Sequence, residues 1–141
     1  MQNEVIVSFG IFDFNDVSHN DISRLLDIQP DKVYIKGEKK NPQNPNSPLI
    51  KKNSWIMRSG LDKYSSFEDQ LTALLDIIED KLANFKTLCD RYYCEISCAL
   101  FVYVDNDEST PWVHLNKRYN TLIKKLNIEF DLDLYVFPKE L

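Results

Sequence analysis

The chain has 141 residues, of which 43% are hydrophobic and 28% charged, and its formal net charge is −5. This length and composition predict one globular domain, residues 1–141, with a real hydrophobic core, and they exclude disordered and fibrous classes. No apolar run approaches the roughly 18–20 residues that span a bilayer. The first nine residues lack the basic region and the cleavage site of a signal peptide. We therefore expect a cytoplasmic protein that does not bind membranes.

The charge is distributed unevenly along the chain. Residues 32–58 hold seven basic side chains and one acidic side chain, a formal charge of +6, which leaves −11 for the remainder. An acidic chain repels phosphate backbones at long range, so nucleic acid is a disfavoured partner.

The three cysteines, Cys89, Cys94 and Cys98, are an odd number. This count favours reduced, buried thiols over a disulfide framework. On a strand, Cys94 and Cys98 lie about 13 Å apart, and their spacing is not the two-residue gap of a zinc knuckle. We expect neither a metal site nor another cofactor.

The N-terminal part predicts a strand followed by a short helix. Residues 4–12 are rich in Val, Ile and Phe, with the apolar residues at odd positions sharing one face. Gly10 indicates a bulge or a close approach of another group. Ser18 and Asp21 match a capping box, and a following proline ends the predicted helix near Ile28.

Two predicted strands, residues 32–36 and 53–59, form a hairpin around a long loop. The loop, residues 39–52, is basic and contains three prolines, which exclude a helix or a central strand because proline lacks an N–H donor. It suits docking on an acidic surface or a phosphate, or serves as a flexible, solubilising loop.

The longest helical pattern covers residues 65–92, with apolar residues every three or four positions. Ser65 and Ser66 are alternative N-caps. About 25 residues is long for a globular helix, so the pattern is compatible with one helix or with two that meet near residues 79–81.

The C-terminal part predicts strand, helix and strand. Residues 94–104 form the longest strand and belong inside the sheet, and Thr110 followed by Pro111 predicts a helix start. Residues 128–137 alternate cleanly and form the last strand. The side chains predicted to face the helices are Ile128, Phe130, Leu132, Leu134 and Val136.

The element order is therefore β-α-β-β-α-β-α-β. Its first six elements match the ferredoxin-like plan. We predict an α+β two-layer sandwich, in which this core is extended by a further helix and strand and all helices lie on one face of a mixed sheet.

An ordered set of motifs resembles the small bacterial family called domain of unknown function 4279. The resemblance covers most of the chain and rests on Phe9-x-Ile11, Ile22-x-x-Leu25-Leu26-x-Ile28-x-Pro30, Lys36-Gly37-Glu38, the Trp55 strand and Phe130-Asp131-Leu132-Asp133-Leu134-Tyr135. It implies a one-domain bacterial protein and supplies no activity, cofactor or catalytic residue.

The sheet face away from the helices is the first candidate site, because aromatic residues with a few charges suit recognition of a protein or a small polar ligand. An ordinary solvated sheet face is the alternative. The candidate binding residues are Asp131, Asp133, Tyr135, Trp55, Lys36, Arg58 and Tyr103.

The leading hypothesis is a non-enzymatic protein that binds another protein, for example as an immunity-type inhibitor of a toxin. Neither His19 nor His114 has a nucleophile at a recognisable spacing, and no glycine-rich phosphate loop occurs. The alternative is a small-ligand or metal-dependent enzyme that uses Asp131 and Asp133, which lie roughly 6–7 Å apart on a strand. Binding of single-stranded nucleic acid is a third, disfavoured reading. An open sheet edge also permits a homodimer.

Overall fold

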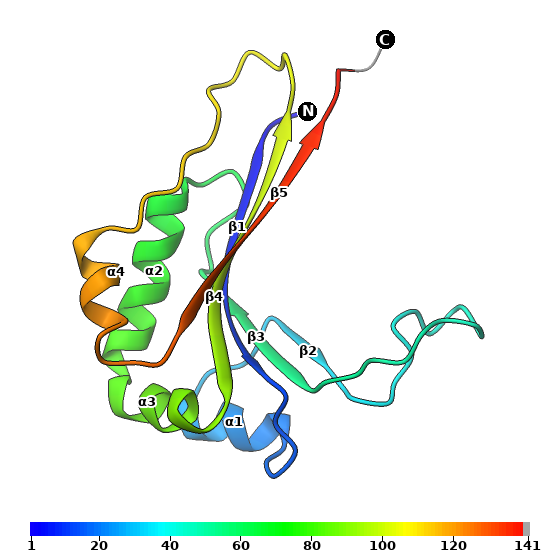
Figure 1. The fold of residues 1–141 in the computed structure, drawn as a ribbon, viewed down its shortest axis with the longest axis vertical. Coiled ribbons are helices and arrows are strands. Elements are labelled where there is room, and N and C mark those ends of the chain that lie inside the picture. Colours follow the sequence, from blue (N-terminus) through cyan, green and yellow to red (C-terminus); the bar gives the residue numbers. More distant parts are fainter. Residues whose placement is uncertain (140–141) are drawn as a thin grey trace.

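The computed structural model describes residues 1–139 (Figure 1). Within them, a mixed five-stranded sheet carries four helices on one face, which confirms the predicted α+β class. The elements are β1 (Glu4–Phe12), α1 (His19–Leu26), β2 (Lys32–Tyr34), β3 (Ser54–Arg58), α2 (Phe67–Asp80), α3 (Leu82–Arg91), β4 (Tyr93–Tyr103), α4 (Lys117–Leu122) and β5 (Glu129–Phe137).

The strands follow the order β2-β3-β1-β4-β5. Antiparallel pairing joins β2 to β3, β3 to β1 and β1 to β4, whereas β5 runs parallel to β4. The long strand β4 therefore lies inside the sheet, and β2 and β5 form its edges. The ferredoxin-like arrangement remains a prediction that rests on the order of the elements.

The predicted helix of residues 65–92 is two helices, α2 and α3, which meet at Lys81. Ser66 is the N-cap of α2, since its hydroxyl accepts a hydrogen bond from the Asp69 N–H. Lys81 leaves the helical conformation with φ of −129°, and its ammonium group donates to the carbonyl oxygens of Leu26 and Asp27 at the end of α1. A cation at a helix C-terminus is favourable, so the break docks α1 against the α2–α3 pair.

The core lies between the sheet and the helices. Odd-numbered residues of β1 and even-numbered residues of β4 point into it, together with the apolar stripes of the helices. Trp55 also belongs here. It is fully buried, and its indole N–H donates to the Ser23 hydroxyl at 3.0 Å. The structure thus corrects the placement of Trp55 among surface binding residues.

The segment after β4 differs from its prediction. Thr110 and Pro111 do not begin a helix, because the chain stays extended until Asn116, whose side chain caps α4. Burial alternates along this segment, so that Val113 packs on the core while Trp112 is exposed. Alternation with period two is the signature of extended chain, and an extended return reaches from the end of β4 back to the start of its parallel partner β5.

The last strand also differs from its prediction. Phe130 packs on the core, but Leu132, Leu134 and Val136 are exposed although they lie on the helical side. The helices cover only the lower part of the sheet, and the upper part of β5 extends past them (Figure 1).

The proline-rich loop is an ordered hairpin extension, which we call the arm (residues 35–53). Backbone hydrogen bonds join Gly37 to Ile50 at 2.9 Å and Lys40 to Pro48 at 2.9 Å, and Lys39 pairs with Leu49. The arm projects away from the helical layer (Figure 1). Among residues 1–139, no helix is long and apolar enough to cross a membrane.

Candidate functional site

The sheet face opposite the helices, here called the open face, is the candidate site. All the helices in residues 1–139 lie on the other face (Figure 1). The even-numbered residues of β1 and the odd-numbered residues of β4 and β5 point to it, because side chains alternate along a strand.

Four aromatic rings form a stacked ladder at the upper end of the open face. The ring centroids of Phe101 and Tyr135 lie 5.0 Å apart, and those of Tyr103 and Phe137 lie 4.8 Å apart, with interplanar angles of 11° and 15°. A third stacked pair joins Phe101 to Phe137 at 6.4 Å. The aromatic ladder places large, rigid, partly exposed surfaces side by side, which is typical of the centre of a protein interface.

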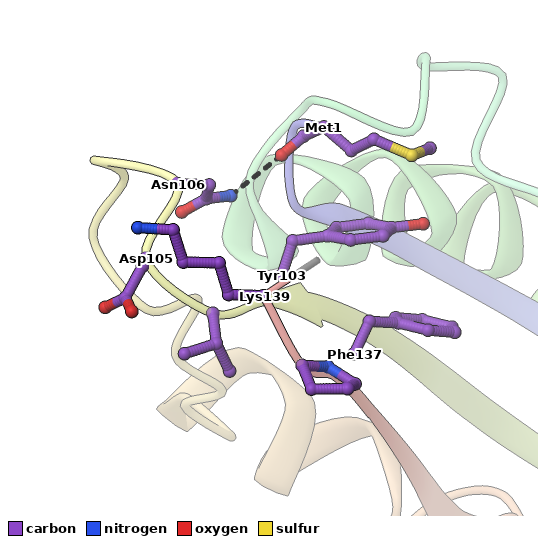
Figure 2. Close-up of a pocket in the computed structure, with 8 residues that line it drawn as sticks. Met1, Tyr103, Asp105, Asn106, Phe137 and Lys139 are labelled. Carbon is purple, nitrogen blue, oxygen red and sulfur yellow. Dashed lines mark hydrogen bonds between the residues drawn. The ribbon is translucent and has the colours of Figure 1, made fainter. Parts of the chain in front are cut away.

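A depression of about 780 Å³ opens where β4 and β5 end, beside the ladder. Figure 2 shows the rings of Tyr103 and Phe137 on one side of it and Asp105 and Lys139 on the other. The Asn106 side-chain amide donates to the Met1 carbonyl at 3.0 Å and so holds the N-terminus at its rim. The depression extends the aromatic surface with polar groups of both charges.

Four carboxylates occupy the lower part of β4 and β5 on the open face and form an acidic foot. The Tyr93 hydroxyl donates to Glu95 at 2.8 Å and lies 3.2 Å from a Glu129 oxygen. The hydrogen bond to Glu95, followed by burial, raises the pKa of Tyr93 above its ordinary value of 10.0, so the phenol stays protonated. The members of the acidic foot are Glu95, Glu129, Asp131 and Asp133.

One cross-strand row links the acidic foot to the basic side of the sheet. Arg58 pairs with Ser8, Ser8 with Ser97, and Ser97 with Asp131. The two serine hydroxyls lie 2.9 Å apart. Three strand spacings separate Arg58 from Asp131, about 14 Å, so these residues do not form an ion pair. Arg58 and Asp131 therefore lie on opposite sides of the open face, with its positive charge on β3 and its negative charge on β5.

The base of the arm holds a second depression, of about 720 Å³. Lys32, Lys40, Lys51 and Lys52 line it together with Tyr34. The Lys32 ammonium lies 4.8 Å from the centre of the Tyr34 ring, a cation–π contact. Within the described part of the chain, none of these four lysines forms a salt bridge. Their charge is therefore available to an acidic surface.

The structure brings Asp131, Asp133, Tyr135 and Tyr103 together on adjacent strands, as the alternation of the last two strands predicted. Arg58 lies across the sheet from them. Lys36 lies at the start of the arm, outside the face. The other two rings of the ladder, Phe101 and Phe137, are not among the binding residues predicted from the sequence. The parallel register of β4 and β5 sets Phe101 opposite Tyr135 and Tyr103 opposite Phe137, and it therefore places the four rings together.

Asp131 and Asp133 are exposed side chains on a strand, and in residues 1–139 no group of three or more His, Cys, Asp and Glu side chains is placed to hold a metal ion. The His19 ring packs on Phe14 and contacts the Tyr34 carbonyl at 3.0 Å, which is a structural role.

No curated protein and no solved structure matches the chain. A family's sequence model, described as "Domain of unknown function (DUF4279)", matches residues 3–137. Because the match spans nearly the whole chain, from the start of β1 to the end of β5, this protein belongs to the DUF4279 family.

Proposed function

We propose that the chain is a non-enzymatic, cytoplasmic protein-binding module whose partner lies on the open face. The observation that carries the proposal is the aromatic ladder, four partly exposed rings on a sheet face that bears no helix in the described residues. Tyr and Phe are enriched at the centres of protein interfaces, where they bury large areas at a small entropic cost.

Charge separation around the ladder supports a protein rather than a small ligand as the partner. The acidic foot lies on one side, and the lysines of the arm lie on the other side of the sheet. A complementary partner carries basic groups toward β5 and acidic groups toward the arm. Such a pattern steers association and fixes orientation.

A concrete form of the proposal is a bacterial immunity-type protein that inhibits a toxin. The small size, the net charge of −5 and the acidic foot support it, since many toxic enzymes that act on nucleic acid need a basic site. In this form, the acidic foot occupies a basic surface of the toxin while the ladder provides the apolar contact.

Affinity capture from an extract of the source cells tests the proposal. The tagged full chain is compared with a ladder variant, Phe101→Ala with Tyr103→Ala, and with an arm variant, Lys40→Glu with Lys51→Glu and Lys52→Glu. The matched control carries Lys117→Glu and Lys124→Glu on the helical layer. We expect the wild type and the control to recover the same protein, and both site variants to recover at least tenfold less.

Each variant is first checked for native circular dichroism, because the Phe101 ring is half-buried. Equal recovery by all four proteins, or repeated recovery of no specific protein, contradicts the proposal. For the toxin form, expression of the captured protein alone arrests growth and co-expression with the wild type restores it. Growth without arrest contradicts that form while leaving partner binding intact.

A further inference from the structure

The outer edge of β5 has no neighbour among the described residues. The Phe137 carbonyl accepts a hydrogen bond from the Val104 N–H at 3.0 Å, so the backbone groups of Phe137 point toward β4. Backbone groups alternate in direction along a strand. The N–H and C=O groups of Leu132, Leu134 and Val136 therefore point to the free edge.

The same three residues have unusually exposed apolar side chains. Leu132 is 47% exposed, Leu134 60% and Val136 56%, on the part of β5 that extends past the helices. Proteins protect free edges with short strands, lysines or prolines. The opposite edge strand, β2, has three residues and includes Lys32, whereas β5 has nine residues, no lysine or proline, and carboxylates only on its open-face side. Of the two sheet edges formed by residues 1–139, only β5 is thus a long edge with apolar side chains.

We propose that a second copy of this chain occupies this edge, with the two β5 strands antiparallel and a twofold axis at Leu134. Leu134 then exchanges two backbone hydrogen bonds with Leu134 of the second copy, and Leu132 pairs with Val136 of the second copy. The exposed apolar stripe becomes a continuous row of six side chains across the seam.

Charge complementarity selects this register. On the open face, Asp133 lies opposite Tyr135 of the second copy, Asp131 opposite Phe137, and Glu129 opposite Lys139. No carboxylate faces another, although β5 contains three. Like charges directly opposite each other are destabilising, and opposite charges are favourable.

Neighbouring registers are worse. An axis at Asp133 places two copies of that carboxylate opposite each other, and an axis at Leu132 places Asp131 opposite Asp133. An axis at Tyr135 sets Leu132 against Pro138, which has no N–H to donate. The axis at Leu134 sets no carboxylate against another, and it moves Pro138 one position further from the axis, opposite Phe130 at the end of the paired segment.

The pairing does not depend on the proposed partner, and it adds to the open face. Each sheet has five strands in the described residues, so the dimer holds one continuous sheet with all helices on the same side. Two open faces then lie side by side, and the aromatic ladder of each copy adjoins the acidic foot of the other.

Light scattering after size exclusion tests the dimer at about 100 µM chain. We expect the wild type to have twice the mass of one chain. Leu134→Lys places two ammonium groups at the axis and should halve the mass without lowering the thermal midpoint, because the side chain is mostly exposed. Val33→Lys on β2, the opposite edge, is the matched control and should stay dimeric.

Disulfide formation tests the register. Leu134→Cys should cross-link to itself, because directly opposite residues have Cα atoms about 5.5 Å apart, within disulfide range. Leu132→Cys alone should not, because its two copies lie about 13 Å apart, whereas a mixture of Leu132→Cys and Val136→Cys should. The native cysteines are buried and give little background.

A monomeric wild type overturns the proposal, as does a dimer that survives Leu134→Lys or equal cross-linking by Leu132→Cys alone. A monomer whose partner capture is lost on Leu134→Lys means instead that a strand of another protein occupies the edge. The ladder variant separates the two proposals, since it should lose the partner and keep the dimer.

Discussion

Gln70 shows how a single buried polar side chain replaces a missing strand. β3 pairs with β1 only from Ser8 to Phe12, which leaves the earlier backbone groups of β1 without a strand neighbour on that side. The Gln70 amide fills the gap, since its oxygen accepts from the Val7 N–H at 3.0 Å and its nitrogen donates to the Val5 carbonyl at 2.6 Å. Gln70 is one of the buried residues of α2, and the others are apolar. The two hydrogen bonds to β1 explain why a polar residue occupies this buried position.

Replacing Gln70 with leucine should therefore destabilise the fold strongly. Two buried backbone groups lose their partners, at about 1–3 kcal/mol each, so we expect a loss of roughly 2–4 kcal/mol in urea unfolding. Gln43→Leu, the same change at an exposed glutamine of the arm, is the control and should change stability by less than about 0.5 kcal/mol. Equal effects of the two substitutions would refute this role.

The three cysteines are all free and buried, as their number and context predicted. Burial, with the Asp133 charge adding to it, raises the pKa of Cys98 to about 12. Hydrogen bonding with Cys89, followed by burial, raises the pKa of Cys94. The thiolate is the reactive form, so these thiols are protected both by access and by protonation.

Labelling with a thiol reagent at pH 8 should accordingly modify none of the three cysteines in the native protein and all three in denaturant. On a longer timescale, the rate of labelling under native conditions should equal the rate at which the core opens, because the reagent reaches these sulfurs only after unfolding. Fast labelling of one cysteine in the native state would show that its segment opens independently.

At the scale of elements, α4 illustrates how a short helix is held without a long apolar stripe. Tyr119 and Leu122 reach the core, while Arg118 binds two carboxylates of α2. Its guanidinium donates to Glu79 at 2.7 Å and 3.0 Å and to Asp76 at 2.6 Å. The ion pairs fix the connection that returns the chain from β4 to β5.

Arg118→Met should lower stability at pH 7 by less than about 1 kcal/mol, since the pairs are partly exposed. The hydrogen bond from Arg118 lowers the pKa of Glu79 below its ordinary 4.5. A lowered folded-state pKa contributes stability that is complete above about pH 5 and is lost as the pH falls through the folded-state value. The difference between wild type and variant in urea unfolding should therefore shrink as the pH falls below the ordinary pKa of 4.5, and a constant difference would exclude the ion pair as its cause.

The elements also show where local patterns succeed. The helices α1 and α2 begin after the predicted N-caps, Ser18 and Ser66, and Asp21 completes the capping box of α1. These starts were predictable because a cap depends on residues that are near neighbours in sequence. The helix start predicted at Thr110 was wrong, although Thr110 and Pro111 are an equally good local capping pattern. There, the return path from β4 to its parallel partner β5 decides the conformation, and that path depends on strand order.

At the scale of the whole molecule, the hydrophobic core lies in the sheet and the helices and does not include the arm. The arm holds none of the buried hydrophobic residues of the core, yet it carries five of the seven basic side chains of residues 32–58. We therefore expect the arm to contribute little to the stability of the fold.

Shortening the arm tests this division. Because Lys39 and Leu49 pair directly and the Lys40 N–H donates to the Pro48 carbonyl, residues 40–48 can be replaced by Lys-Asn-Gly-Thr, whose central Asn-Gly forms a two-residue hairpin turn. We expect the free energy of unfolding to change by less than about 1 kcal/mol, since no core contact is removed. A drop comparable to that of Gln70→Leu would show that the arm supports the core.

Sequence alone determined the class of the fold, most element positions and the two-sided character of the last strand, since these follow from periodicity and capping between near neighbours. Tertiary structure decided which faces are covered. Trp55 and Leu134 both lie in strand patterns typical of burial, yet the former is fully enclosed and the latter is 60% exposed. The reason is that burial depends on how far the helical layer extends over the sheet and on which strand forms its edge, and neither is encoded in the pattern of a single segment.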